Sequence, residues 1–404
     1  MTSPLPNRGK DGENDNDQAF DDLVALTSQG VRFHGTEGLQ SSAAWLEEEL
    51  VSAGITSERQ PVVVPGWKPG ETCRLSITEP YVREVRVWPL LWSGPSRGVQ
   101  SGRLVAQGRE GLWGDSMVWR RFIVLDENGD VIAYVLGRDT GPAAPQPLPS
   151  GSDYSAPHFA VSRNDSDQLS EWIVDGREIL VEFELDSAHG GQASGDNLIV
   201  DLPGVTGSEN KPTILVCAHY DTFWNTPGAY DNGSGTIALL HLAQRWAKNP
   251  PENPTRLVFF TGEEWHLSGS RAYVAEATPP ELDAVGYVIN IDGLGRGKFL
   301  ESFGAPERFE VAFSSTIRRY IESTRGGLEV ISRFPPPMGT DDAAFYAAGV
   351  PSGFMTFNDF NRLHQPEDVP NREIAANIVW TVGLVDFLVQ TLEIPQRADA
   401  PGIL

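Results

Sequence analysis

Four short apolar runs of this chain are each followed by side chains that could bind a metal ion. The runs are TILVCA, RLVFF, GYVINI and GFMTF. In the same order, the residues that follow them are His219, the pair Glu263 and Glu264, Asp292 and, further into a loop, His364. Imidazole and carboxylate groups together are the ligands expected of zinc or a similar divalent metal. The pattern therefore raises the hypothesis of a metal site.

Each of these residues, taken alone, also has a simpler structural interpretation. Glu263 and Glu264 would form a solvated turn whose charges stabilise the start of the next helix. A histidine after a strand is more often a hydrogen-bonded loop residue, and an aspartate there is more often a turn or cap. Several such coincidences at one edge of a sheet are far less expected by chance, so the combination favours the metal site.

The apolar runs are predicted to be neighbouring strands, because helical stretches such as GSGTIALLHLAQRWAK lie between them. This alternation predicts an α/β fold with a mostly parallel central sheet and helices on both faces. Ligands bind beyond the carboxyl ends of the strands in such sheets. A further acid, Asp231, lies in the glycine-rich loop GAYDNGSG just before a helix and is expected at the same edge.

Changes in sequence texture divide the chain into five segments. We expect a flexible arm (1–19), an N-terminal helical part (20–59), an inserted β-rich domain (60–190), a catalytic domain (191–395) and a C-terminal tail (396–404). The inserted block contains short β-type runs separated by Gly, Pro and Ser, and its segment RFIVLDENGDVIAYVLG is predicted to be a hairpin.

Composition limits the classes of partner. The 404 residues include 55 acidic and 31 basic side chains, a formal charge of −24, which disfavours nucleic acid and anionic membranes. The two cysteines, Cys73 and Cys217, provide neither a disulfide framework nor a cysteine zinc site. The polar N-terminal stretch lacks the apolar core of a signal peptide, and no stretch of about 18 apolar residues is recognised, so no membrane span is expected. We therefore expect a cytoplasmic protein, of open oligomeric state.

The chain resembles the di-zinc peptidases that include bacterial leucyl aminopeptidase, aminopeptidase Y and glutamate carboxypeptidase. The matching motifs, in the family's order, are HYD, GAYDNGSG, TGEEWHLSGS, NIDGLG, GTDDAAFYAAGVP and LHQPEDV. The resemblance covers about 191–395, and 20–55 is similar to the family's N-terminal helix. The block 60–190 stands where many members carry a protease-associated domain.

The resemblance implies two zinc ions per chain bridged by Asp231. His219 and Asp292 would complete one site, and Glu264 and His364 would complete the other. It also implies a cis peptide bond after Asp231.

Two further roles concern residues that would bind no metal ion directly. By the resemblance, Glu263 would be the general base. Asp221 would orient the imidazole of His219 through its other nitrogen. Both residues are therefore expected to be catalytic.

The chain departs from the family at two places. Members often have a histidine where this chain has Asp342, after Thr340 and Asp341, and several place a tyrosine upstream, where this chain reads Pro-Pro-Pro-Met. What supports a developing oxyanion is therefore open. His266 is expected to be a pocket-wall or helix-start residue. The other histidines are expected to be structural: His34, His158, His189 and His241.

The leading hypothesis is an aminopeptidase that hydrolyses the N-terminal amide bond of a peptide with a metal-bound hydroxide. An alternative is a metal-dependent amidohydrolase acting on a non-peptide amide or an N-acyl amino acid. A glutaminyl-cyclase-like enzyme and a non-catalytic binding protein are weaker hypotheses. The side-chain specificity is open, but aromatic residues near the motifs suggest an apolar pocket: Trp224, Trp265, Phe303, Phe334 and Phe360.

Overall fold

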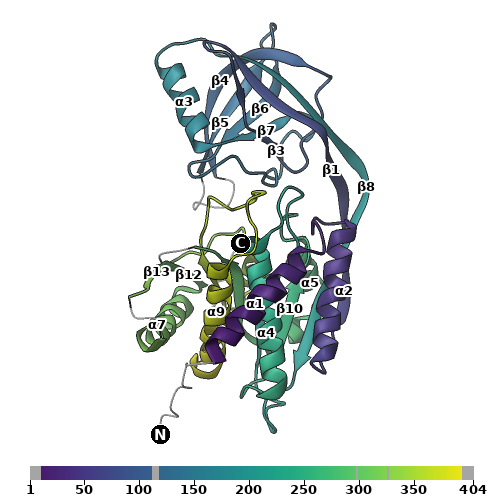
Figure 1. Cartoon of the computed structure of the whole chain (residues 1–404), viewed down its shortest axis with the longest axis vertical. Coiled ribbons are helices and arrows are strands. Elements are labelled where there is room, and N and C mark those ends of the chain that lie inside the picture. The colour runs from purple at the N-terminus through teal and green to yellow at the C-terminus, as the bar shows by residue number, and fades with distance from the viewer. Residues whose placement is uncertain (1–10, 112–117, 297–298, 325–326, 394–404) are drawn as a thin grey trace.

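The computed structural model describes residues 11–111, 118–296, 299–324 and 327–393. Figure 1 shows a lower part, in which helices surround a sheet, and an upper β-rich part. Two long strands, β1 (Glu58–Glu79) and β8 (Leu180–Leu202), run between them. The fold is therefore a mixed α/β fold with a β-rich insertion.

The sheet of the lower part has the strand order β13-β12-β14-β11-β9-β10-β8. Its centre is parallel, as predicted: β10, β9, β11 and β14 pair in parallel, whereas β8 and β12 join this group in the antiparallel direction. The strand bounds are β9 (Thr213–His219), β10 (Thr255–Phe260), β11 (Val285–Leu294), β12 (Phe299–Ala305), β13 (Glu329–Arg333) and β14 (Ser352–Phe357).

Both faces of the central strands are buried, which explains their nearly continuous apolar sequences. Along β9, Ile214 and Val216 belong to the main core, whereas Leu215 and Cys217 belong to a second core on the opposite face. Residues from α1, α2, α4, α7 and α9 contribute to the main core. Residues from α5 and α8 contribute to the second core.

The helices of this part are α1 (Asp11–Thr27), α2 (Glu37–Ser52), α4 (Ser234–Lys248), α5 (Ser268–Glu276), α6 (Pro279–Ala284), α7 (Glu307–Thr324), α8 (Asp342–Ala347) and α9 (Arg372–Thr391). Among the described residues, α9 is long and apolar enough to cross a membrane, judged by length and composition only. Of its apolar window, 61% is buried in the fold, and a buried core helix passes the same test. The expectation that no such stretch exists overlooked this helix.

The predicted flexible arm at 1–19 is corrected for the residues that the structure describes. Helix α1 begins at Asp11, and Ala19 and Leu23 are buried in the main core. The first turns of this helix contain only glycine and polar residues, and its apolar residues begin at Ala19, so the sequence resembles a solvated arm. Residues 1–10 and the predicted tail 396–404 lie outside the described part of the chain.

The region from Phe20 to Ile55 is also not one helix. Gly30 has φ of +103°, and Thr36 caps α2 by accepting a hydrogen bond from the Leu39 N–H. The connection between α1 and α2 buries Arg32, Phe33 and His34.

The upper part contains β1, β2 (Arg83–Val85), β3 (Trp88–Pro89), β4 (Gln100–Gly111), β5 (Val118–Leu125), β6 (Val131–Gly137), β7 (His158–Val161), α3 (Arg163–Val174) and β8. The predicted hairpin is confirmed, because β5 pairs with β6 in the antiparallel direction. A separate apolar core that includes Phe122, Phe159 and Phe183 supports the proposal of a distinct domain.

The expected boundaries at 60 and 190 do not coincide with linkers. Both fall inside β1 and β8, which pair with each other from Glu58 opposite Ile199 to Glu79 opposite Leu180. The insertion is therefore joined to the lower part by continuous strands. We refer to residues 60–190 as the insert below.

Candidate metal centre

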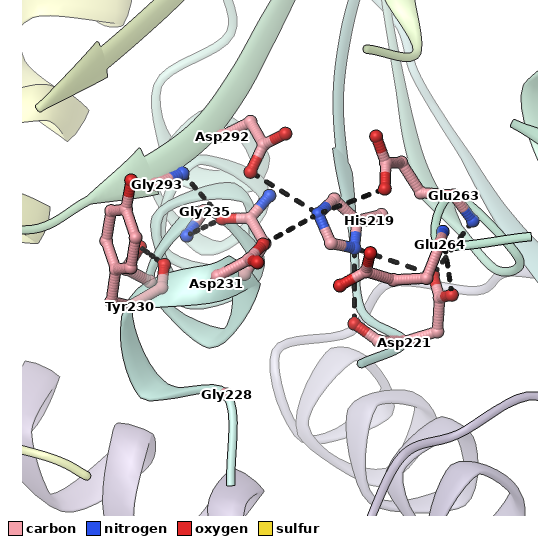
Figure 2. A network of polar contacts seen from close by, with 12 residues as sticks. His219, Asp221, Gly228, Tyr230, Asp231, Gly235, Glu263, Glu264, Asp292 and Gly293 are labelled. Carbon is pink, nitrogen blue, oxygen red and sulfur yellow. Dashed lines mark hydrogen bonds and ion pairs between the residues drawn. The ribbon is translucent and has the colours of Figure 1, made fainter. Parts of the chain in front are cut away.

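The ends of the central strands bring the predicted ligands together at one edge of the sheet. His219 is the last residue of β9, Asp292 lies near the end of β11, and Glu263 and Glu264 follow β10. Asp231 lies in the turn before α4. Figure 2 shows these side chains converging from separate elements. His364, in the loop after β14, reaches the same place.

The side chains form two groups that meet at Asp231. In the first, the Nε2 atom of His219 is 3.3 Å from Asp231 Oδ1, 3.3 Å from Asp292 Oδ1 and 3.9 Å from Glu263 Oε2. In the second, the Nε2 atom of His364 is 3.0 Å from Asp231 Oδ2 and 3.3 Å from Glu264 Oε1. Each oxygen of Asp231 therefore faces a different histidine.

The chemistry of these residues fits bound divalent metal ions. In each of two groups, His219 with Glu263 and Asp292, and Asp231 with Glu264 and His364, the possible ligand atoms lie within 4.8 Å of one another. The set combines imidazole nitrogens with carboxylate oxygens, as zinc sites do. The buried Nε2 atom of His219 makes no hydrogen bond of good geometry within the described residues, although such atoms are nearly always satisfied in proteins. A cation would satisfy it.

The electrostatics of the metal-free site reflect burial and crowded charges. Burial raises the pKa of Glu264 to about 7, and burial with the nearby Glu264 charge holds the pKa of Glu263 well above its usual range. Burial alone would raise the pKa of Asp231, but the imidazoles of His219 and His364 lower it. Burial would lower the pKa of His364, yet Glu264 and Asp231 raise it to about 10. The site therefore retains protons that a metal ion would displace.

Asp221 contacts more than the histidine that it was expected to orient. His219 Nδ1 is 3.2 Å from the backbone oxygen of Asp221 and 3.5 Å from its Oδ1 atom. The same carboxylate accepts hydrogen bonds from the backbone N–H groups of Glu263 at 3.1 Å and Glu264 at 3.3 Å. Asp221 thus connects His219 to the backbone that carries both glutamates.

His364 is oriented by the insert. Its Nδ1 atom is 2.7 Å from the backbone oxygen of Pro145 and 3.1 Å from the side-chain amide of Gln146. The next residue, Gln365, donates from its amide to the backbone oxygen of Ala143 at 2.8 Å. An Nδ1–H donated to Pro145 leaves Nε2 to face Asp231 and Glu264. No sequence pattern predicted these contacts, because a backbone oxygen has no residue-type signature.

The loop that carries Asp231 is held by two charged residues without a predicted role. The buried guanidinium of Arg32 donates to the backbone oxygens of Tyr220, Pro227 and Gly228 at 2.6–2.7 Å. Asp368 accepts from the N–H groups of Tyr230 at 2.8 Å and Asp231 at 3.1 Å. The Asp231–Asn232 peptide bond is cis. The motif LHQPEDV contains Asp368 and could have indicated its role. No motif contains Arg32, so its role could not be predicted.

The departures from the family pattern lie beside the two groups. Asp342, which stands where a histidine is common, is fully buried and accepts from Thr340 Oγ1 at 2.6 Å and Asn290 Nδ2 at 3.3 Å. Burial raises its pKa to about 6. His266 packs against Trp92 with ring centroids 4.7 Å apart and belongs to neither group, consistent with the predicted wall position.

The other histidines have contacts outside the centre. His34 Nδ1 is 3.0 Å from Thr261 Oγ1, and His241 pairs with Asp22 at 2.7 Å. In the insert, His158 stacks on Tyr134 with ring centroids 4.5 Å apart. His189 Nε2 lies 3.2 Å from the backbone oxygen of Ser93.

Two cavities adjoin the centre and share Glu263. The larger, about 280 Å³, includes Asp231, Glu264 and Asp292 in its lining. Its apolar wall consists of Phe303, Phe354, Phe360, Leu363 and Pro337. The smaller, about 230 Å³, lies between the insert and the start of α5.

Two of the five aromatic residues expected in an apolar pocket, Phe303 and Phe360, line the larger cavity. Trp224 and Trp265 pack in a separate cluster with Phe33, and Phe334 is exposed. The expectation therefore holds only in part.

Comparisons with known proteins identify the same region. The model of "Peptidase family M28" matches residues 197–387. Aminopeptidase YwaD of Bacillus subtilis is 26% identical over 243 residues, covering 54% of this chain and 48% of YwaD. A vacuolar membrane protease of Candida albicans is 32% identical over 130 residues, covering 32% of this chain and 15% of that protein. The matched relatives are thus covered over half of their length or less.

Solved structures match the fold over most of the chain. A peptidase M28 precursor from Shewanella amazonensis has a TM-score of 0.72 at 20% identity, covering 96% of this chain and 98% of its own. BSAP, a zinc aminopeptidase from Bacillus subtilis, has a TM-score of 0.63 at 18% identity, covering 91% and 94%. Together with the strand-end ligands, these findings show that residues 197–387 match peptidase family M28 and that the chain has the fold of the solved peptidases.

Proposed function

We propose that the chain is a di-zinc aminopeptidase, with one ion held by His219, Asp292 and Asp231 and the other by His364, Glu264 and Asp231. The observation that carries the proposal is the carboxylate of Asp231, whose two oxygens lie 3.3 and 3.0 Å from the two histidines. A carboxylate between two imidazoles can bridge a pair of metal ions, one oxygen to each. Zinc bound there would polarise the scissile carbonyl and make a water molecule more acidic.

Glu263 is the proposed general base. Its carboxylate is 3.9 Å from His219 Nε2 and lines both cavities. A carboxylate in this position can accept a proton from water and deliver that proton to the leaving amine. Asp221 fixes the position of Glu263 through the backbone hydrogen bond described above.

The acidic, apolar-walled cavity supports an N-terminal amino acid as the group that is released. Carboxylates of the centre attract a free α-ammonium group, and the aromatic wall of Phe303, Phe354 and Phe360 suits an apolar side chain. The names of the relatives, an aminopeptidase and a protease, agree with a peptide substrate. An apolar N-terminal residue is therefore the expected preference.

A metal-dependent amidohydrolase acting on N-acyl amino acids is the second candidate. It is favoured by the loop that lacks the family's tyrosine and instead places Pro337 and Thr340 in the larger cavity. A cyclase that binds one zinc ion fits less well with two groups of ligands. The oligomeric state stays open, and the cytoplasmic location stays a prediction.

One experiment separates these functions. The zinc-loaded protein is assayed with aminoacyl-p-nitroanilides, N-acyl amino acids and N-terminal glutaminyl peptides, with and without chelator. The proposal predicts chelator-sensitive hydrolysis of the p-nitroanilides, fastest with apolar residues. Activity only on N-acyl amino acids would support the second candidate, and no activity on any substrate would contradict both.

A further inference from the structure

The smaller cavity has a composition that the proposed aminopeptidase chemistry does not explain. It is lined by Pro147, Pro149 and Ser150 of the insert, by Met338 and Gly339, and by Glu263, His266, Leu267 and Arg271. It contains none of the five proposed metal ligands. Arg271 is the one arginine or lysine in its lining.

The position of this cavity relative to Glu263 identifies the part of the substrate that it faces. The larger cavity contains the metal-ligand carboxylates, whereas the smaller shares only Glu263 with it. A general base passes its proton to the leaving amine, so the leaving group must lie within reach of Glu263. One loop separates the two cavities, with Pro337 and Thr340 lining the larger and Met338 and Gly339 lining the smaller.

The backbone directs Arg271 into this cavity. His266 and Leu267 both have φ of +59°, a conformation that few residues other than glycine adopt. Helix α5 follows at once, and the Arg271 N–H bonds to the backbone oxygen of Leu267 at 2.9 Å. Residues four apart share a helix face, so Leu267 and Arg271 line the same wall.

The guanidinium of Arg271 is available for a ligand. No ion pair joins it to a carboxylate within the described residues, although the chain carries 55 acidic side chains. Arg256 of β10, in contrast, makes two hydrogen bonds to Asp201 at 2.7 and 2.8 Å. An exposed arginine that lines the same cavity as the proposed general base is suited to a planar carboxylate.

The insert lines the other side of the cavity. Pro147 and Pro149 are rigid residues of the segment that also holds His364 through Pro145 and Gln146. Because that segment is fixed at the metal centre, it limits the room beyond the leaving residue. A short leaving group therefore fits better than a long peptide.

We infer that Arg271 binds the α-carboxylate of the leaving amino acid, so that the preferred substrates end one residue after the scissile amide. This inference rests on the proposed hydrolase function and names its substrate class: dipeptides or N-acyl amino acids with a free carboxylate. Both share the same leaving group and differ only in what occupies the larger cavity. The bond broken is the amide, water is consumed, and the proton taken by Glu263 leaves with the amine.

The test compares kcat/KM for matched pairs that differ only in the terminal carboxylate. One pair is leucyl-leucine and leucyl-leucinamide, and the other is N-acetyl-leucine and N-acetyl-leucinamide, each with zinc-loaded protein. We expect the free carboxylate to be preferred by about 10- to 100-fold, the range of a charge-assisted hydrogen bond. The pair that is hydrolysed reveals which substrate type enters the larger cavity.

Arg271→Met should abolish this preference while leaving the amide substrate and leucyl-p-nitroanilide unchanged, and Arg271→Lys should retain part of it. Arg318→Met removes an exposed arginine from α7 and is the matched control. It should change kcat/KM for neither the carboxylate nor the amide substrate. An unchanged preference in Arg271→Met, or an equal loss with both substrates, would overturn the inference while the proposed function stands. No hydrolysis of any substrate by the zinc-loaded protein would overturn both.

Discussion

The two halves of the candidate metal centre use similar side chains but are held by different parts of the chain. In the His219 half, the orienting groups are the backbone and carboxylate of Asp221, two residues away in sequence. In the His364 half, they are Pro145 and Gln146, which lie 219 and 218 residues away in the insert. One half is thus organised locally, and the other depends on contact between the insert and the catalytic part.

This difference has a consequence for metal binding. A histidine ligand needs a partner for its second nitrogen, which fixes both the tautomer and the ring. The His219 half should therefore form whenever the central strands fold. The His364 half should also require the insert to be in place, so its metal affinity should report on that contact.

The largest expected effect comes from the residue that both halves share. Asp231→Ala removes the oxygens that face His219 and His364, so we expect both ions to be lost and turnover to fall by about 10³-fold or more. Metal analysis after reconstitution and dialysis measures the first effect. Retention of one tightly bound ion would show that the halves are independent.

The adjacent glutamates should separate metal binding from proton transfer. Glu263→Gln should keep both ions but lower turnover by roughly 10²–10⁴-fold, the usual range for a general base, with no rescue by added zinc. Glu264→Gln should lower the affinity for the ion bound at His364, and excess zinc should partly restore activity. Metal affinity and activity equal to those of the unchanged protein in both variants would contradict the proposed roles of these buried glutamates.

The residue types of the centre made most of it predictable. His219, Asp231, Glu263, Glu264, Asp292 and His364 each follow a recognisable apolar run or a glycine-rich loop, and the structure brings them together. The parallel order of the central strands followed from the same alternation of strands and helices.

Four features could not be predicted, for physical reasons. Pro145 acts through a backbone oxygen, and Arg32 acts on three backbone oxygens far along the chain, so neither position has a distinctive pattern. The start of α1 is polar and resembles a solvated arm. The predicted insert boundaries fall inside β1 and β8. These two strands continue through positions 60 and 190, so no loop or turn marks the boundary there.

A smaller effect should follow from loosening the insert side alone. Gln146→Ala removes the side-chain amide that lies 3.1 Å from His364 Nδ1, so we expect about a 10-fold loss of affinity for one ion and little change at the other. Gln168→Ala, on α3 of the insert and away from the centre, is the matched control. Isothermal titration of the metal-free proteins with zinc resolves the two steps. A loss at both ions would contradict the local organisation of the His219 half.

A further expected effect is the pH dependence of the metal-free protein's stability. His364 with a pKa of about 10 and Glu264 with a pKa of about 7 both hold protons that the unfolded chain would release. Folding therefore binds protons, and the free energy of unfolding should fall as pH rises from about 4.5 to 10. Thermal unfolding across this range measures it. Zinc should remove most of the dependence, and stability that instead rises with pH would contradict these shifts.

The most direct test of the two-metal account is a crystal structure of the zinc-loaded protein with anomalous diffraction measured at the zinc edge. The account predicts two zinc peaks about 3.5–4 Å apart, one bonded to His219 Nε2 and the other to His364 Nε2, with one oxygen of Asp231 on each. A single peak after full reconstitution, or two peaks that do not share Asp231, would contradict it.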